Sequence, residues 1–239
     1  QSRSQRFTRL FPTVGLWRHR AQGLSISAFA RSTHLLGVAC GQATLKGLSI
    51  RQCYFGPAGD FFAEEMQAQG TDLRMESSGR RHPRRPGYET PLGTPVPSEA
   101  WEEALTQRTL RPLPPARMEL LIRPESEGLQ LHLRSAAESL PGVLAQVALD
   151  FPVGGEWITT SGAFWPVANQ AILLTQGWGR MRYGDDAIEI TPGHNAHRYY
   201  QMRDSSPHPG LVRIIIGLKT PIDYRLTLRW RRGAEAWLA

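Results

Sequence analysis

Apolar and polar residues alternate along many short segments of this 239-residue chain. In YRLTLRW, near the C-terminus, Tyr224, Leu226, Leu228 and Trp230 occupy every second position. A period of two places such side chains on one face of a β-strand, where they pack in a core while the residues between them meet water. The pattern recurs at 24–28, 35–39, 48–52, 73–75, 118–122, 129–133, 143–151, 181–190 and 212–216. We therefore predict about a dozen strands.

These strands follow one another without the helical patterns that a parallel sheet needs for its crossovers. One short helix is expected, because Ser98 can cap it, Glu99 lies in its first turn, and Trp101 and Leu105 are four residues apart on one face. The predicted fold class is therefore all-β: a large antiparallel β-sandwich with one short helix.

The length suits one large sandwich better than two small domains. Residues 1–22 are basic and irregular but contain apolar side chains such as Trp17, so we expect an N-terminal arm that packs as an entry strand or a cover. Residues 23–232 are expected to form the single sandwich domain, with a sub-boundary possible in the Pro-rich segment 86–115, and residues 233–239 a C-terminal tail.

The composition, 41% apolar and 21% charged, excludes a disordered chain. No run approaches the roughly 18 apolar residues of a membrane-spanning helix, so no membrane span is expected. The net charge of +7 favours anionic partners. Part of the excess lies in GRRHPRRPG, which we expect to be an exposed loop that either is simply solvated or binds an anion. Its candidate ligand-binding residues are Arg80, Arg81, Arg84 and Arg85.

The chain begins at Gln1 without a Met or an apolar targeting segment, so we expect a trimmed, mature or excised form. Its two cysteines, Cys40 and Cys53, each lie in a strand-like stretch with a turn between them. A disulfide and two free thiols both fit this spacing. Two cysteines without CxxC spacing cannot form a thiolate metal site.

Several catalytic signatures are absent: the phosphate-binding P-loop, the dinucleotide fingerprint, HExxH and GxSxG. We therefore expect no cofactor. Metal binding by His194 and His197 is not expected either, because side chains three apart on a strand diverge.

The segment PGHNAHRYYQM nevertheless gathers imidazoles and phenols. If a strand begins at His197, then His197, Tyr199 and Gln201 share one face of it. A His beside a Tyr can supply the base and the acid for proton abstraction next to a carboxylate, although both also occur as structural residues on strands. The candidates are His197 and Tyr199 as catalytic residues and His194, Arg198 and Tyr200 as ligand-binding residues.

Three tryptophans, Trp157, Trp165 and Trp178, lie near Gly, Ser and Thr residues rather than in the clearest alternating runs. Exposed Trp rings stack on sugar rings, so these residues are candidates for carbohydrate contact. Packing within the core is the alternative for each of them.

The second half of the chain resembles a known family. FPVGGEW, GWGRMRYGDDAIEITPG, NAHRYYQMR and IIIGLKTPIDYRLTLRW follow in this order, and GLSIRQCYFGPAGDFF precedes them. This series resembles the β-sandwich domain of heparinase II/III-like polysaccharide lyases and their uncharacterised bacterial relatives, a supersandwich of the galactose-mutarotase-like group. The resemblance covers most of residues 20–232.

The resemblance implies a domain that lines a carbohydrate cleft beside a helical α/α-toroid domain of the same protein and sometimes contributes a His. That role would fall to His197, alone or together with Tyr199. The toroid supplies much of the lyase catalytic set and is absent from this sequence, so the sandwich is expected to be inactive alone. A mutarotase-like enzyme would also need a carboxylate, for which Glu156 and Glu189 are only guesses.

The leading expectation is an accessory, carbohydrate-contacting sandwich of a secreted or periplasmic bacterial protein that binds acidic polysaccharide or oligosaccharide. A structural or protein-interaction sandwich without a sugar site is the first alternative. A self-sufficient lyase or epimerase that uses His197 and Tyr199 is the second. Nucleic-acid binding through the arginine loop is the least favoured.

Overall fold

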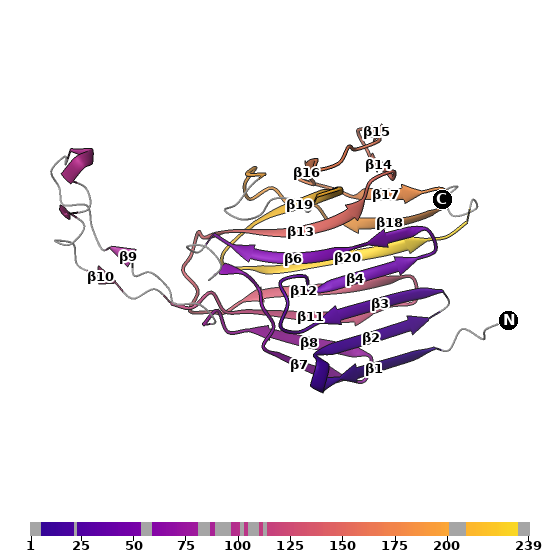
Figure 1. Ribbon diagram of the computed structural model, residues 1–239, viewed down its shortest axis with the longest axis horizontal. Helices are drawn as coiled ribbons and strands as arrows, with labels where there is room; N and C mark the ends of the chain where they lie inside the picture. The colour runs from indigo at the N-terminus through magenta and orange to yellow at the C-terminus, as the bar shows by residue number, and fades with distance from the viewer. Residues whose placement is uncertain are drawn as a thin grey trace.

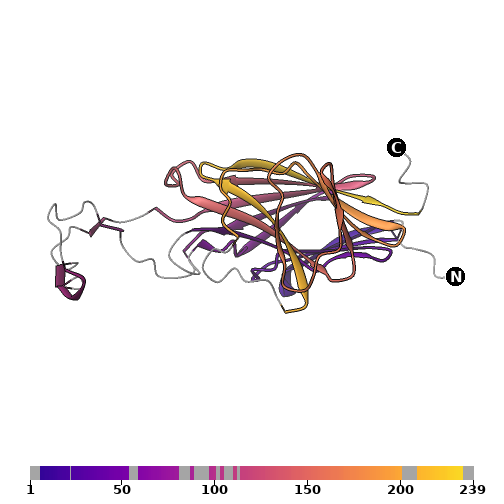
Figure 2. The ribbon, with the colours of Figure 1, turned by 90° about the horizontal axis from the view of Figure 1, so that it is seen from above.

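The computed structural model describes residues 6–21, 23–53, 59–80, 87–88, 97–100, 103–104, 110–111, 114–200 and 209–233. Strands dominate these residues, and they form two layers that face each other across one core (Figure 1). Figure 2 shows the layers from above, with the indigo strands of one separated from the yellow final strand of the other. The predicted all-β sandwich is confirmed.

One layer is a nine-stranded sheet in the order β15-β14-β17-β18-β20-β12-β11-β8-β7. All its neighbours pair antiparallel. Its strands are β7 (Glu65–Gln69), β8 (Asp72–Ser77), β11 (Met118–Pro124), β12 (Gly128–Ser135), β14 (Glu156–Thr159), β15 (Gly162–Phe164), β17 (Gly179–Tyr183), β18 (Asp186–Thr191) and β20 (Asp223–Arg231).

The other layer combines a five-stranded and a four-stranded sheet, ordered β1-β2-β3-β4-β5 and β16-β19-β13-β6. Among the named strands, only the short β16 pairs in parallel, with β19. The strands are β1 (Phe7–Phe11), β2 (Leu16–Ala21), β3 (Leu24–Phe29), β4 (Leu36–Cys40), β5 (Ala43–Leu45), β6 (Gly47–Gln52), β13 (Leu144–Pro152), β16 (Ala171–Leu173) and β19 (Leu211–Lys219).

Segment 43–52 joins the two sheets of this layer. Its first half, β5, pairs with β4, and its second half, β6, pairs with β13. Between them the backbone N–H of Lys46 donates a 2.8 Å hydrogen bond to the carbonyl of Asp150. One buried cluster fills the space between the layers, with Trp17, Ile26, Leu131, Ile214 and Leu228 among its members.

The expected N-terminal arm forms two strands of the sandwich. β1 pairs with β2 along its whole length, and β2 pairs with β3 from Leu16–Phe29 to Ala21–Leu24. Trp17 is fully buried, because the alternation within β2 turns it into the core. The chain therefore enters the sheet well before residue 23.

The described part of the Pro-rich segment contains little regular structure. β9 (Gly87–Tyr88) pairs with β10 (Leu110–Arg111), Ser98–Ala100 forms a 3-10 helix, and 103–104 are helical. Trp101 and Leu105, on which the helix prediction rested, lie outside the described residues. Pro12–Val14, between β1 and β2, forms a second 3-10 helix.

The two cysteines lie on different parts of the fold. Cys40 is buried at the end of β4, while Cys53 is exposed just after β6. Both thiols are free, because β5 and β6 carry the chain away from Cys40. Of the two possibilities that the spacing allowed, the structure therefore has free thiols.

Candidate functional site

Residues 192–200, here called the strap, do not form the strand that the sequence analysis considered from His197 onward. A single bridge, between Asn195 and Gly217 of β19, is the strap's only ladder pairing among the described residues. The strap approaches β19 closely, since a Cβ atom at Gly217 would lie 2.6 Å from the carbonyl oxygen of His197. The strand on which a shared face of His197 and Tyr199 depended is therefore not formed, and Gln201, the third residue of that face, lies outside the described residues.

His197 fastens the strap to β13. Its side chain is buried, and Nε2 lies 2.8 Å from the carbonyl oxygen of Ala145. The backbone N–H of Tyr199 donates to Nδ1 at 3.2 Å. A carbonyl accepts and an amide donates, so these two contacts together require the neutral ring with its proton on Nε2. Both ring nitrogens are thus engaged by the backbone.

The other strap candidates fall into two groups. His194 places Nδ1 2.8 Å from the carbonyl oxygen of Gly217 and its ring edge against Tyr224, so it also anchors the strap. Tyr199 and Tyr200 are exposed, and Arg198 donates from Nε to Asn195 at 3.3 Å. The strap therefore combines two imidazoles that hold it in place, the buried His197 and the exposed His194, with two exposed phenols.

The three candidate tryptophans occupy three different environments. Trp157 is 2% exposed and packs against Gly179 in the core. Trp165 follows β15 and is 68% exposed. Trp178 is half-buried beside Arg180, whose guanidinium carbon lies 5.1 Å from the ring centroid. Only the last two present any surface to a ligand.

Of the four arginines of the basic loop, only Arg80 belongs to the described residues, and Arg81, Arg84 and Arg85 lie outside them. Arg80 lines a surface hollow of about 380 Å³ together with several carboxylates. The other lining residues are Glu64, Glu65, Glu76, Ser78, Pro115, Arg117 and Glu138. Arg80 therefore lies among acidic side chains.

The outer face of the nine-stranded sheet, formed by the side chains that point away from the core, is charged over most of its width. Direct cross-strand neighbours of opposite charge stabilise such a face. Register makes Glu119 the neighbour of Arg134, Glu189 that of Arg180, and Glu156 that of Arg182. Among the described residues, the ion pairs on this face include Arg74–Glu76, Arg117–Glu76, Arg74–Glu119, Arg134–Glu119, Arg123–Asp72, His132–Asp223, Arg180–Glu189 and Arg182–Glu156.

Two of these ion pairs lower the pKa of Glu119. Burial alone would raise the pKa of Glu119, but hydrogen bonds from Arg134 and Arg74 outweigh it and hold that pKa below its ordinary value. Glu156 and Glu189, the carboxylates considered for a mutarotase-like site, are nearly buried and each is bound by an arginine. Each is thus a partner of a cross-strand arginine.

Three arginines on the same face stand outside the ion pairs. Arg225, Arg229 and Arg231 point outward from β20, where they alternate with the buried Leu226, Leu228 and the half-buried Trp230. Within the part of the chain that the structure describes, none of them has a carboxylate oxygen at ion-pair distance. We call them the arginine row. It is the candidate functional site.

The sequence analysis did not select the arginine row, although its signal is visible in YRLTLRWRR. The analysis used the apolar positions of this run to predict a strand and left the positions between them unassigned. Arginine at 225, 229 and 231 shares one face of that strand. Only the register of β20 with β12 and β18, however, reveals which carboxylates are near the row.

The described residues thus define a two-layer antiparallel β-sandwich with a charged outer sheet face. None of its helices is long and apolar enough to cross a membrane, within the ranges described. No group of three or more His, Cys, Asp and Glu side chains is placed to hold a metal ion in the same ranges.

Comparison with known protein families, with curated proteins and with solved structures finds no match for this chain. The resemblance to heparinase II/III-like sandwich domains therefore stays a prediction.

Proposed function

We propose that this chain is a carbohydrate-contacting accessory β-sandwich that binds acidic polysaccharide or oligosaccharide along the arginine row and does not turn it over alone. The observation that carries the proposal is the alignment of Arg225, Arg229 and Arg231 on one exposed strand face without acidic partners among the described residues. Guanidinium groups bind carboxylate and sulfate groups through paired hydrogen bonds.

The spacing of the row suits a linear polymer. A strand rises about 3.4 Å per residue, so the row extends roughly 20 Å from Arg225 to Arg231. Thr227 lies between the arginines and adds a hydroxyl group at the centre of the row. An extended acidic chain lying along β20 would meet all three guanidinium groups in turn.

The surroundings of the row favour a narrow ligand. Asp223 flanks one end of the row, and Glu189 is the cross-strand neighbour of Arg229. These carboxylates, at one end of the row and on its β18 side, narrow the region of positive potential, whereas duplex DNA presents two separated phosphate rails. A single acidic glycan chain fits this pattern better than a nucleic acid does.

The strap supports a binding role over a catalytic one. Proton abstraction by His197 needs a free ring nitrogen within reach of the substrate. Nδ1 accepts the Tyr199 amide and Nε2 donates to the Ala145 carbonyl, so each nitrogen would first have to leave a backbone partner. Tyr199, with an exposed ring, remains available for ligand contact.

Binding to immobilised polygalacturonate, alginate and heparin tests the proposal. Arg225→Ser/Arg229→Ser/Arg231→Ser should weaken binding at least tenfold, and the wild-type affinity should fall steeply between about 50 and 200 mM salt. Arg74→Ser/Arg123→Ser/Arg134→Ser is the matched control: it removes three ion-paired arginines from the same face and should retain most of the binding. Equal losses of binding in both variants would show that net charge alone controls glycan binding, and would contradict the proposal.

Two further measurements separate the competing functions. Tighter binding of a single-stranded oligonucleotide than of an acidic glycan of equal charge would favour nucleic acid. Release of unsaturated uronate, or anomer interconversion, by the wild-type chain would show that it acts as a lyase or epimerase alone. As a binder of exported polysaccharide, the protein is also proposed to be secreted or periplasmic, which cell fractionation can check.

A second function, a structural or protein-interaction sandwich, is favoured by one observation. Phe164, Trp165 and Val167 are all exposed in and just after β15, an edge strand of the nine-stranded sheet. Apolar side chains grouped on a surface are typical of contact with another protein surface, such as a helical toroid of the same parent protein. No glycan binding, together with tight binding to a domain encoded in the same gene that Trp165→Ser weakens, would favour this function.

A further inference from the structure

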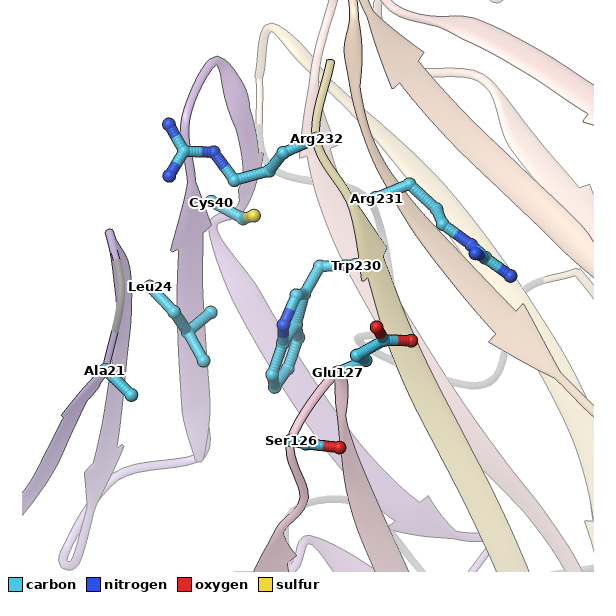
Figure 3. Close-up of a pocket in the computed structure, with 8 residues that line it drawn as sticks. All are labelled: Ala21, Leu24, Cys40, Ser126, Glu127, Trp230, Arg231 and Arg232. Carbon is cyan, nitrogen blue, oxygen red and sulfur yellow. The ribbon is translucent and has the colours of Figure 1, made fainter. Parts of the chain in front are cut away.

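A pocket of about 250 Å³ opens at the end of the sandwich beside the last residues of β20 (Figure 3). Both layers contribute to it. Residues from β2, β3 and β4 form one side, and the turn before β12 and the end of β20 form the other. The lining residues are Ala21, Leu24, Cys40, Ser126, Glu127, Trp230, Arg231 and Arg232.

One part of the pocket is apolar. Trp230 is half-buried, and its indole stands opposite Leu24 and Ala21 in Figure 3. The backbone N–H of Trp230 donates a 3.2 Å hydrogen bond to the carbonyl of Glu127, which holds the strand end and the turn together. The pocket therefore offers an aromatic face in a fixed position, the surface on which the C–H groups of a sugar ring stack.

The other part is polar and mixed in charge. Arg231 and Arg232 project to opposite sides of the strand in Figure 3, while Ser126 and Glu127 lie below them. Asp186 forms an ion pair with Arg232, with Nε to Oδ1 at 3.8 Å, and its Oδ2 accepts a 2.7 Å hydrogen bond from the backbone N–H of Gln42. Arg232 thus has an anchored position, and half of its side chain remains exposed.

The pocket's size limits its ligand. Pockets for drug-sized molecules have about 300–1,000 Å³, and this one is smaller. It has room for one sugar ring rather than two. An aromatic face, the guanidinium group of Arg232, a carboxylate and a hydroxyl group are the complement of one uronic acid, which presents C–H faces, one carboxylate and several hydroxyl groups.

The pocket is also continuous with the arginine row, because Arg231 belongs to both. We propose that the pocket is a terminal subsite that takes the single uronic acid residue at one end of an acidic oligosaccharide, with the following residues lying along Arg229 and Arg225. This inference rests on the function proposed above. It adds a preference for chain ends that the row alone would not give.

Titration of the folded chain with galacturonate and glucuronate, and with galactose and glucose as neutral controls, tests the pocket. The indole N–H signal of Trp230, assigned with Trp230→Phe, should shift with the uronates and stay unchanged with the neutral sugars. Arg232→Ser should weaken uronate binding at least fivefold, and it substitutes an exposed side chain, which leaves the core intact. Equal binding of the neutral sugars would overturn the proposal.

Ligand length separates this inference from the proposed function. Arg232→Ser should weaken binding of a trimer at least fivefold but change binding of a long polymer less than twofold, since chain ends are rare there. Arg225→Ser should instead weaken binding of the long polymer more than binding of the trimer. If the row variants lose polymer binding while Arg232→Ser changes neither ligand, the terminal subsite is overturned and the proposed function stands. If the wild-type chain binds no polymer at all, the proposed function fails and the terminal subsite fails with it.

Discussion

Asp150 of β13 and Arg213 of β19 form a buried, doubly hydrogen-bonded ion pair on the four-stranded sheet. Nε donates to Oδ1 at 2.7 Å and an Nη to Oδ2 at 2.8 Å, and the two side chains are only 2% and 6% exposed. The two residues are direct cross-strand neighbours on the face of the sheet opposite the core. Both faces of β13 and β19 are buried, so the pair is shielded from water on every side.

Loss of either partner should therefore destabilise the protein strongly. Asp150→Asn leaves Arg213 charged in a buried position and should lower the free energy of unfolding by about 3–5 kcal/mol, measured by urea denaturation. Asp72→Asn is the control, because it breaks the exposed pair with Arg123 and should cost less than about 1 kcal/mol. Similar losses in both variants would contradict the buried role of Asp150.

His197 should prove to be a fastening residue of the strap. His197→Ala removes two hydrogen bonds to backbone groups and leaves the Ala145 carbonyl without its donor, which should cost about 1–3 kcal/mol of stability. Amide hydrogen exchange should speed up at residues 194–199. Tyr199→Phe keeps the backbone contacts and should leave both measurements unchanged. Unaltered stability in His197→Ala would count against this role.

The sequence predicted the fold class because alternation is a local property of each strand. It could not predict the order of the strands, since that depends on pairings between distant segments. β13 pairs with β6, from the first quarter of the chain, and β20 lies between β12 and β18. Such pairings follow from how the apolar faces meet in three dimensions.

The candidate site shows the same limit. The alternation at 225, 229 and 231 could have placed three arginines on one strand face from sequence alone. The pairing of Glu156 with Arg182 and of Glu189 with Arg180 depends on the register of the strands. That register cannot be read from the sequence. The strap was misassigned because its short polar alternation looks like a strand, whereas in the structure the two imidazoles bond to carbonyls of β13 and β19.

The exposed pair of His132 and Asp223 should have a measurable pH signature. The hydrogen bond from His132, and then the positive charges of Arg225 and Arg134, hold the pKa of Asp223 below its ordinary value. A carboxyl group with a lowered pKa stabilises the folded state above its unfolded pKa, and that contribution is lost as the pH falls through the folded pKa. NMR titration of the Asp223 carboxyl should show the depression, and His132→Leu should raise the pKa toward its ordinary value. An unchanged titration in His132→Leu would rule out the hydrogen bond as the main cause.

Thiol labelling should distinguish the two cysteines. Burial raises the pKa of Cys40, and the thiolate is the reactive form, so Cys40 should react slowly in the folded protein. The exposed Cys53 should react at once. One thiol should be labelled in native buffer and two in denaturant, without reductant. If no thiol reacts in denaturant until a reductant is added, a disulfide is present.

Gly179 of β17 should tolerate no side chain, because the ring of Trp157 lies directly against it. A Cβ atom at this position would be 2.2 Å from two ring atoms of Trp157, which is itself 2% exposed. Gly179→Ala should therefore cost about 1–3 kcal/mol through overpacking, measured by thermal or urea denaturation. Gly37→Ala in β4 is the matched control, since its Cβ would lie at an ordinary 3.6 Å from the nearest atom.

Combining Gly179→Ala with Trp157→Phe should give a smaller loss of stability than the sum of the two single losses, because the smaller ring makes room for the methyl group. Strict additivity would show that the glycine is needed for a reason other than the tryptophan.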